Sequence, residues 1–429
     1  MLPTLQIKVY HINKNRIIVP KSHYFRMKDV KLIHHGFKKV PCEVLSHNQK
    51  QNTVYLSSSI MKHLHLKNQS DVIIYSNKNS CSIYYLFGVL VHQQPNKLKH
   101  EPLYQEMARV GHTLGFETIL FSPQDLDRIS HTTNGSIFQQ HNWTKIETDI
   151  PPVIYNRIPN RAIENHTKIK QAKSYLKTTS ILFNPHFFDK WHVYDQLKNS
   201  DDVNYLLPET TFHPSQTTIN EALTQHPIYL NPLSYSKKYN KYYIEKVDNR
   251  LFVAITGKQK EHSYFESTEL FFNEYFPKGA QQYVLQDAIR YMEVQGEPFL
   301  FRIYTLKNFD NQWRVVLHYM KKFVLSSYDT SETVIPLSMV FTKKEAAAML
   351  KKLDDIALKL SSIVDAQMDN SFGELGFDIG LDQENRLWLA EVYAKPSWDI
   401  FYHPAIASKT STYFTQLFNI GLSKLKVSE

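Results

Sequence analysis

The chain has 429 residues, of which 42% are hydrophobic and 21% charged, a composition typical of a folded protein with a sizeable core. A chain of this length usually forms two or three domains. The sequence contains neither G-x-x-x-x-G-K-S/T nor G-x-G-x-x-G, which excludes the P-loop and the dinucleotide-binding fingerprint. Its two cysteines, Cys42 and Cys81, are too few for a disulfide framework or a cysteine-based zinc module.

Positive charge is concentrated near the N-terminus. The first 100 residues contain 15 Lys and Arg but only three acids, whereas the whole chain has 50 basic and 41 acidic residues. A region of this kind attracts nucleic acid and other polyanions. The alternative interpretation, a small β domain that lysine side chains keep soluble, stays open because no nucleic-acid-binding motif accompanies the charge.

No segment of the sequence predicts a membrane span. The longest apolar run, about 84–91, is far shorter than the roughly 20 residues that a membrane helix needs. The first 20 residues alternate polar and apolar side chains and lack the continuous apolar stretch of a signal peptide. We therefore expect a cytoplasmic protein.

The N-terminal region favours short strands rich in Val, Ile and Tyr, separated by polar clusters. One short helix is expected at Ser57–Leu66. This pattern predicts a small β barrel or sandwich. The expected strands are Gln6–Tyr10, Arg16–Val19, Lys38–Leu45, Thr53–Leu56, Val72–Ser76 and Ser82–Val91.

The pattern changes after this region. Helical spacing over Leu103–Gly115 precedes strand patterns at Glu117–Phe121 and Pro152–Tyr155, which together predict an α/β unit. Strands and helices then alternate to the end, and the clearest helix, Lys343–Asp365, follows a capping box that begins at Thr342. We predict three domains, at residues 1–85, 86–180 and 181–429.

The most informative stretch is a predicted β-hairpin near the C-terminus. Two alternating runs, Gly376–Asp382 and Arg386–Tyr393, flank a polar turn. If the turn closes at 384–385, Asp378 lies directly opposite Glu391, with both side chains on one face roughly 5 Å apart. Two carboxylates this close repel unless a cation lies between them, and oxygen ligands suit Mg²⁺ or Mn²⁺ that carries a nucleotide phosphate. A solvated hairpin with two unrelated acids is the alternative.

The sequence here resembles a known family. An Asp, a Glu thirteen residues later and a polar residue before Lys-Pro are similar to the metal-binding end of the ATP-grasp superfamily. More closely, the chain resembles the YheC/YheD group of endospore coat-associated proteins. The supporting segments occur in the order of that group: Val153–Arg161, Leu182–Trp191, Leu207–Thr210, Tyr283–Ile289, Pro298–Arg302, Phe309–Trp313 and the hairpin.

The resemblance implies an α+β protein. Its ATP-grasp fold, of two α+β lobes, would follow a small α/β pre-grasp unit and a β-rich N-terminal domain. Enzymes of this kind bind ATP between the lobes, phosphorylate a carboxylate and let an amine or thiol attack the acyl phosphate. Mg²⁺ neutralises the transferred charge, and lysine and arginine side chains hold the phosphates.

Residue roles follow from the same resemblance. Asp378 and Glu391 match the metal-bridging acids, and Lys190 matches the first phosphate-contacting lysine. Arg302 matches the arginine beside the γ-phosphate. The strand that links the lobes, whose backbone would bind adenine, is matched by Gln286, Asp287, Ala288 and Ile289.

Several positions depart from the family pattern. Leu300 replaces an aspartate, and Tyr393 replaces the asparagine that completes the metal site. A Tyr phenol is a poor Mg²⁺ ligand at neutral pH because its pKa is about 10. Lys321 or Lys322 stands where a nucleotide-contacting arginine is usual, and lysine cannot reproduce a bidentate guanidinium.

The small-lobe phosphate loop departs furthest. Asn231 stands where a lysine belongs, and every expected glycine after it is missing. A backbone that wraps a triphosphate needs glycine for close approach. The loop instead carries cationic and bulky side chains at Tyr235, Lys237, Lys238, Tyr239 and Lys241.

Three hypotheses follow. The first is a degenerate ATP-grasp protein of the spore coat, with weak or lost carboxylate–amine ligase activity and a basic N-terminal domain as its attachment surface. Its partners would be a nucleotide and spore coat proteins, and its cofactors ATP and Mg²⁺, both weak or lost. The second is an active ATP-dependent ligase whose altered loop fits an unusual substrate. The third is a protein that binds nucleic acid or another polyanion through the basic N-terminal domain.

Overall fold

The computed structural model describes residues 5–36, 38–49, 52–66, 71–76, 78–233, 239–256, 261–323, 333–368 and 370–427. The chain forms two compact units. Unit 1 comprises Met1–Pro185, Lys307–Gln312 and Ser408–Glu429, and unit 2 comprises His186–Leu306 and Trp313–Ala407. Unit 1 contains both of the first two expected domains, and the boundary expected between them stays a prediction.

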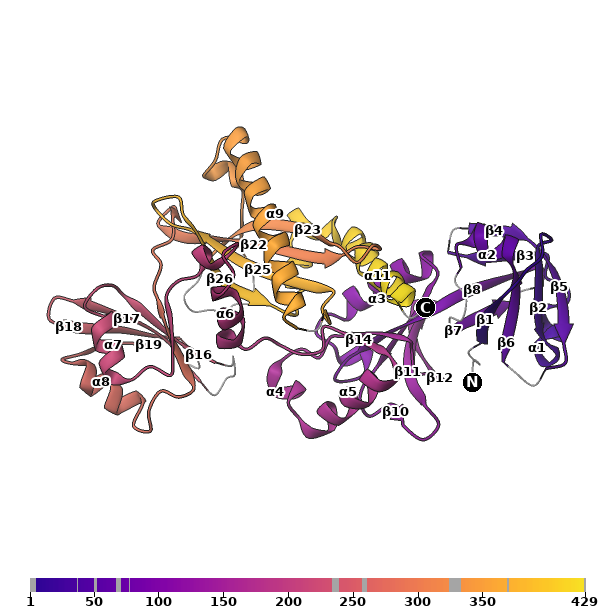
Figure 1. Cartoon of the computed structure of the whole chain (residues 1–429), viewed down its shortest axis with the longest axis horizontal. Coiled ribbons are helices and arrows are strands. Elements are labelled where there is room, and N and C mark those ends of the chain that lie inside the picture. Colours follow the sequence, from indigo (N-terminus) through magenta and orange to yellow (C-terminus); the bar gives the residue numbers. More distant parts are fainter. Residues whose placement is uncertain are drawn as a thin grey trace. The chain divides into compact units, whose positions relative to one another are not determined.

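The N-terminal part of unit 1 is a ring of short strands (Figure 1). Its elements are β1 (Leu5–Tyr10), β2 (Arg16–Pro20), α1 (Lys21–Met27), β3 (Leu32–His35), β4 (Lys38–Pro41), β5 (Glu43–His47), β6 (Thr53–Ser57), α2 (Ser58–Leu64), β7 (Asp71–Ser76) and β8 (Ser80–Leu90). Neighbouring strands pair in the order β3–β8–β7–β1–β6–β2–β5, and β4 pairs with β3. Only Cys42 separates β4 from β5. β4 pairs with β3 at one end of this order, and β5 pairs with β2 at the other end. The segment β4–β5 therefore closes the sheet into a barrel, one of the two predicted forms.

Strand β8 continues from the barrel into an α/β sheet. The further elements are η1 (Pro95–Lys97), α3 (Glu101–Thr113), β9 (Phe116–Phe121), β10 (Leu126–Asp127), β11 (Thr132–Gln139), β12 (Asn142–Asp149), β13 (Val153–Asn156), α4 (Arg161–Glu164), α5 (Thr167–Thr179) and β14 (Ile181–Phe183). β8 pairs in parallel with β9 on one side and with β13 on the other, and β13 pairs in parallel with β14. Parallel neighbours need a crossover connection, which α3 and α5 provide.

The helix near the C-terminus belongs to unit 1. This helix, α11 (Thr410–Val427), packs on α3 and contacts β13. The ring centroid of Phe418 lies 4.8 Å from that of Phe87 and 5.0 Å from that of Phe116. Gly111 of α3 permits this approach, because a Cβ at that position would collide with the Phe418 ring. The end of the chain therefore completes the core of a unit that begins at its start.

The first sheet of unit 2 is antiparallel. Its elements are β15 (Thr210–Phe212), α7 (Gln216–Ala222), β16 (Ile228–Pro232), β17 (Lys241–Val247), β18 (Arg250–Thr256), β19 (Glu261–Phe265), α8 (Thr268–Tyr275) and β20 (Tyr283–Asp287). The strand order is β15–β20–β16–β17–β18–β19. Buried side chains of α7 and α8, such as Ile219 and Phe271, share one apolar cluster with Tyr242 and Leu230 of the sheet.

The second sheet of unit 2 carries the predicted hairpin. The remaining elements of this unit are α6 (Lys190–Lys198), η2 (Asn204–Leu206), β21 (Glu293–Val294), β22 (Glu297–Lys307), β23 (Trp313–Lys322), β24 (Val334–Ile335), η3 (Leu337–Met339), α9 (Lys343–Ala366), β25 (Glu374–Leu381), β26 (Leu387–Tyr393), η4 (Asp399–Tyr402) and α10 (Pro404–Ala407). The strand order is β24–β23–β22–β25–β26. Leu353, Leu360 and Val364 of α9 are buried in the same apolar cluster as Phe377 and Ile379 of β25. The predicted helix and its capping box are confirmed.

Two elements of the barrel were not predicted, and one expected strand is broken. The missed elements are α1 and β3; α1 has no side-chain cap and no acid in its first turn, so the sequence signals of a helix start are absent. The expected strand Lys38–Leu45 breaks at Cys42, whose N–H donates to the carbonyl of Lys31 at 2.9 Å. Within the described ranges, no helix combines the length and apolar character that crossing a membrane requires.

A buried carboxyl group connects the barrel to the α/β sheet. Glu117 of β9 is 3% exposed and accepts a hydrogen bond from the Tyr75 hydroxyl of β7 at 2.8 Å. The side chain of Gln139 on β11 donates to the same hydroxyl at 3.1 Å. Burial raises the pKa of Glu117 to about 7, although the hydrogen bonds from Tyr75 and Gln139 oppose the rise. The carboxyl group therefore binds its proton more tightly in the folded protein than in the unfolded chain.

We expect unit 1 to lose stability as the pH rises towards 7. A carboxyl group whose pKa rises on folding stabilises the fold fully below its ordinary pKa of 4.5, and this contribution disappears as the pH passes the folded value of about 7. The difference amounts to roughly 3 kcal/mol of unfolding free energy. Glu117→Gln, which is neutral at every pH, should remove this dependence in denaturant unfolding followed by circular dichroism. Equal pH dependence in the variant and the parent would contradict the assignment.

Candidate functional site

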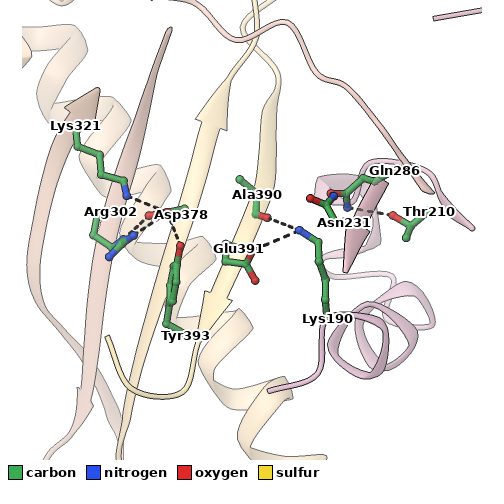
Figure 2. A network of polar contacts seen from close by, with 10 residues as sticks. All are labelled: Lys190, Thr210, Asn231, Gln286, Arg302, Lys321, Asp378, Ala390, Glu391 and Tyr393. Atoms are coloured by element: carbon green, nitrogen blue, oxygen red, sulfur yellow. Dashed lines mark hydrogen bonds and ion pairs between the residues drawn. The ribbon is translucent and has the colours of Figure 1, made fainter. Parts of the chain in front are cut away.

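Three charged residues lie in one row across the second sheet of unit 2 (Figure 2). The register places Arg302 of β22 opposite Asp378 of β25, and Asp378 opposite Glu391 of β26. Directly opposed residues of antiparallel strands extend their side chains on the same face. The predicted pairing of Asp378 with Glu391 is confirmed, and the sheet adds Arg302 to the pair.

The turn of the hairpin is a three-residue loop. The N–H of Asp382 donates to the carbonyl of Arg386 at 2.9 Å, and Asn385 between them has φ 61°. A left-handed residue at the end of such a loop is typical of hairpins of this length. The Asp382 carboxylate holds the loop together, because its oxygens accept from the N–H groups of Glu384 and Arg386 and from the Trp388 indole at 2.8–2.9 Å.

A β-bulge then sets which residue faces Asp378. The three-residue loop alone would place Ala390 there, but the pairing shifts by one residue between Asp378 and Ile379. The extra residue on β26 brings Glu391 opposite Asp378. The carbonyl of Ala390 accepts a hydrogen bond from the ammonium group of Lys190 at 3.5 Å. The bulge therefore positions both a carboxylate and a carbonyl oxygen of the site.

The Asp378 carboxylate is surrounded by donors from three neighbouring strands. Arg302 binds it with two nitrogens: Nε donates to Oδ1, and Nη2 donates to Oδ2 at 2.8 Å. Lys321 of β23 lies 3.2 Å from Oδ2, and the Tyr393 hydroxyl donates to the same oxygen at 3.0 Å. Burial alone raises the pKa of Asp378, but the charges of Arg302 and Lys321 outweigh it and hold the pKa well below its usual range. The carboxylate is therefore ionised, buried and fully hydrogen-bonded.

Glu391 has a different partner. The ammonium group of Lys190, the first residue of α6, lies 3.3 Å from Glu391 Oε2, and the two side chains are 12% and 16% exposed. Asp189 caps this helix, since its side chain accepts from the N–H of His192 at 3.1 Å. Lys190 and Glu391 line a small hollow, together with Gln286 of β20.

The strand expected to bind adenine lies at this hollow. The Gln286 side chain donates to Thr210 Oγ1 at 3.1 Å and accepts from Asn231 Nδ2 at 3.4 Å, so it is tied to both neighbouring strands (Figure 2). Two of the expected backbone donors already take part in hydrogen bonds with neighbouring backbone. The N–H of Asp287 donates to the carbonyl of Glu209 at 3.1 Å. Ala288 N–H donates to the carbonyl of Pro227 at 3.0 Å.

One backbone acceptor of this strand has no ladder donor opposite it. In an antiparallel hydrogen-bonded pair each residue gives its N–H and receives one in return. Pro227, opposite Ala288, has no N–H to return. The carbonyl of Ala288 therefore receives no ladder hydrogen bond from Pro227, and Ile289 follows it directly.

A residue that the sequence did not single out lies near the two acids. Tyr291 is 8% exposed, and its ring packs against Gly380 of β25, where a Cβ would collide with it. Burial raises the pKa of Tyr291, and the charges of Asp378 and Glu391 raise it further, which places the phenol near both acids. Nothing in its sequence neighbourhood indicates this position, because it depends on an isolated bridge between Tyr291 and Asp382.

The departures from the family pattern have different outcomes in the structure. Leu300 is 2% exposed and lies opposite Gly380, so no acid replaces the missing aspartate there. Lys322 pairs with Glu297, whereas Lys321 binds Asp378. Of the loop after Asn231, the side chains at 235, 237 and 238 lie outside the described residues.

The residues present do not fit a divalent metal ion at Asp378. A carboxylate has about four lone-pair positions, and Arg302, Lys321 and Tyr393 already direct four donor groups at them. Among the described residues, no group of three or more His, Cys, Asp or Glu side chains could enclose a metal ion. Mg²⁺ prefers several oxygen ligands in octahedral geometry, so it would have to displace the bound arginine.

The chain is similar to several known proteins. The Bacillus subtilis (strain 168) endospore coat-associated protein YheD is 26% identical over 411 residues, which cover 91% of this chain and 90% of that protein. YheC of the same organism is 24% identical over 315 residues, covering 70% and 86% respectively. N5-carboxyaminoimidazole ribonucleotide synthetase from Thermotoga maritima matches with a TM-score of 0.46 and 12% identity, covering 78% of this chain and 76% of that one.

D-Alanine-D-alanine ligase from Coxiella burnetii matches with a TM-score of 0.44 and 9% identity, covering 80% and 97% respectively. The family model described as YheC/D like ATP-grasp matches residues 180–421, more than half of the chain. Its range contains both sheets of unit 2 and the row of charged residues described above. The chain therefore belongs to the YheC/D-like ATP-grasp family.

Proposed function

We propose that unit 2 binds ATP or ADP through its phosphates, that its carboxylate–amine ligase activity is weak or lost, and that the protein acts at the spore coat. The observation that carries this proposal is the charge of the row across the sheet. Lys190 contacts the carboxylate of Glu391, and Arg302 and Lys321 contact that of Asp378. Three cationic side chains thus gather at a largely buried site, and such donors suit the oxygens of a phosphate.

The nucleotide fits these residues at both of its ends. Its phosphates would be held by Lys190, Lys321 and Arg302, whose cationic donors form strong hydrogen bonds with phosphate oxygens. The exocyclic amino group of adenine is a donor, and the carbonyl of Ala288 is an acceptor to which Pro227 donates no ladder hydrogen bond. A bound ATP would supply an activated phosphoryl group, whose transfer depends on positioning and on charge stabilisation.

The loss of ligase activity follows from the state of the two acids. Asp378 and Glu391 face each other as a shared metal ion requires, but each is paired with a cation of the chain itself. Without a metal the transferred phosphoryl group would lose part of its charge stabilisation. A metal-binding role for Asp378 and Glu391 stays a prediction. It belongs to the alternative hypothesis, in which the protein is an active ligase.

A role at the spore coat is proposed from the two relatives. Both YheD and YheC carry the description endospore coat-associated, and the similarity to YheD covers 91% of this chain. The N-terminal region has 15 basic residues and three acids in its first 100 positions. We propose it as the surface that attaches the protein to an acidic component of the coat.

Lys190→Met should weaken ADP binding. The substitution keeps the apolar stem and removes the ammonium group, so we expect the dissociation constant measured by isothermal titration calorimetry to rise at least about tenfold. Lys198→Met, at the far end of the same helix, is the matched control and should bind as the parent does. If the parent binds ADP no more tightly than about 1 mM, the nucleotide proposal is wrong.

Magnesium should change ADP affinity little. Because donors of the chain occupy the Asp378 oxygens, we expect dissociation constants with Mg²⁺ and with EDTA to agree within about threefold, roughly 0.7 kcal/mol. The same calorimetric titration gives both values. A tightening by Mg²⁺ of about tenfold or more that Glu391→Gln abolishes would instead support the active ligase.

Asp378→Asn should destabilise unit 2. The substitution leaves Arg302, 4% exposed, without its counter-charge, and breaking a buried pair in this way costs about 3–5 kcal/mol of unfolding free energy. The depressed pKa of Asp378 gives the sign of the pH dependence: the pair stabilises the fold above the ordinary carboxyl pKa of 3.8 and is lost only in stronger acid.

Denaturant unfolding at neutral pH measures the effect of Asp378→Asn. Asp354→Asn, on α9 and 36% exposed beside His318 of β23, is the control and should cost at most about 1 kcal/mol. Equal stabilities of the two variants would show that the pair does not hold the sheet.

A further inference from the structure

The first helix of the barrel exposes an aromatic side chain. α1 packs on β2 and β5, and its residue Met27 is 3% exposed. Phe25 of the same helix is 79% exposed, more than any other phenylalanine or tyrosine of the described residues. Single exposed apolar side chains are common on protein surfaces, so the surroundings of Phe25 decide what it means.

The second helix of the barrel shows that this position does not need an apolar residue. α1 begins directly after β2, α2 begins directly after β6, and each helix has seven residues. The fifth residue is exposed in both helices and is Phe25 in α1 but Lys62 in α2. The fold therefore accepts a lysine at this place, and the packing of the barrel does not explain the aromatic ring.

Cationic side chains surround the ring. Lys21 lies one helical turn before Phe25, Arg26 follows Phe25 directly, and both are exposed. The ammonium group of Lys28 lies 5.0 Å from the centroid of the Phe25 ring. Residues 20–41 contain six Lys and Arg but a single acid. The exposed surface of α1 therefore combines an apolar centre with a positively charged border.

This combination suits one kind of partner better than others. An acidic protein segment would use the cations but not the ring. Single-stranded nucleic acid offers rings as well as charge, but the proteins that bind it stack successive bases on several aromatic side chains, whereas α1 exposes one ring with a lysine over it. A membrane of anionic lipids is negatively charged at its surface and apolar beneath, so it uses both features of the helix.

We propose that α1 docks on a membrane surface rich in anionic lipid, with the Phe25 ring entering the headgroup layer and Lys21, Arg26 and Lys28 contacting lipid phosphates. The inference rests on the attachment proposed above for the basic N-terminal region and names anionic lipid as its partner. It does not depend on nucleotide binding by unit 2.

Replacement of Phe25 by lysine tests the proposal, because charge attraction and ring insertion predict changes of opposite sign. The full-length protein is mixed with vesicles of phosphatidylglycerol and phosphatidylcholine, and the bound fraction is measured by sedimentation. Attraction alone would strengthen the binding of Phe25→Lys about fivefold, because the variant gains a positive charge. If the ring enters the headgroup layer, its loss outweighs this gain, and we expect binding to weaken at least about threefold.

Matched variants separate insertion from a general effect of the substitution. Ile129→Lys replaces another apolar side chain of unit 1, 94% exposed but outside the barrel, and should bind the vesicles at least as tightly as the parent. Phe25→Trp keeps an aromatic ring at the position and should also retain the parent affinity. Vesicles of phosphatidylcholine alone, which carry no net charge, should bind the parent at least about tenfold more weakly. Circular dichroism confirms that each variant is folded.

The outcomes distinguish this inference from the attachment on which it rests. If the parent does not bind the anionic vesicles, or if Phe25→Lys binds them more tightly than the parent, the lipid inference is wrong. Salt-dependent binding of the parent to polyglutamate would then still support attachment through charge alone. Binding to oligothymidylate without binding to vesicles would assign the surface to nucleic acid and overturn the inference. If the parent binds neither vesicles nor polyglutamate at low salt, the attachment proposal and this inference both fail.

Discussion

The buried ion pair between Arg302 and Asp378 is the constraint on which the architecture of the site depends. Both side chains are about 5% exposed, and either charge would be costly to bury alone. Strands β22 and β25 must therefore keep the register that joins them. Lys321, Tyr393 and Glu391 take their positions relative to this pair, because each reaches it from a neighbouring strand of the same sheet.

The same pair changes what the site can bind. In an acid pair that holds a metal, the carboxylate oxygens must remain available to the ion. Here each acid is paired with a cation of the chain itself, Asp378 with Arg302 and Glu391 with Lys190. A hairpin that places two carboxylates face to face therefore offers a metal ion fewer available oxygens than the facing alone suggests.

The sequence predicted those features that depend on local patterning. The capping box and the apolar spacing predicted the long helix α9. The alternation of polar and apolar residues in the hairpin predicted that Asp378 and Glu391 face each other. The prediction placed the turn at 384–385, whereas the structure has a three-residue loop and compensates with a bulge at Ala390. The predicted turn was one residue too short and the bulge was not predicted, and these two errors shift the register in opposite directions. The prediction therefore paired Asp378 with Glu391 correctly without a correct description of the strand.

Features that depend on long-range contacts could not be predicted in this way. Tyr291 reaches the acids only because an isolated bridge joins it to Asp382, more than 90 residues along the chain. The bidentate contact of Arg302 with Asp378 and the role of Lys321 likewise depend on how separate strands pair.

The helix α11 has a consequence for the order in which the protein matures. Unit 1 consists of Met1–Pro185, Lys307–Gln312 and Ser408–Glu429, and the remaining residues between them form unit 2. During synthesis Phe418, which covers Phe87 and Phe116, is added only after the whole of unit 2 has been synthesised. The nascent N-terminal portion must therefore persist with an apolar surface uncovered until Phe418 has been synthesised. A premature stop after residue 407 would leave this surface permanently bare and open to chaperones and proteases.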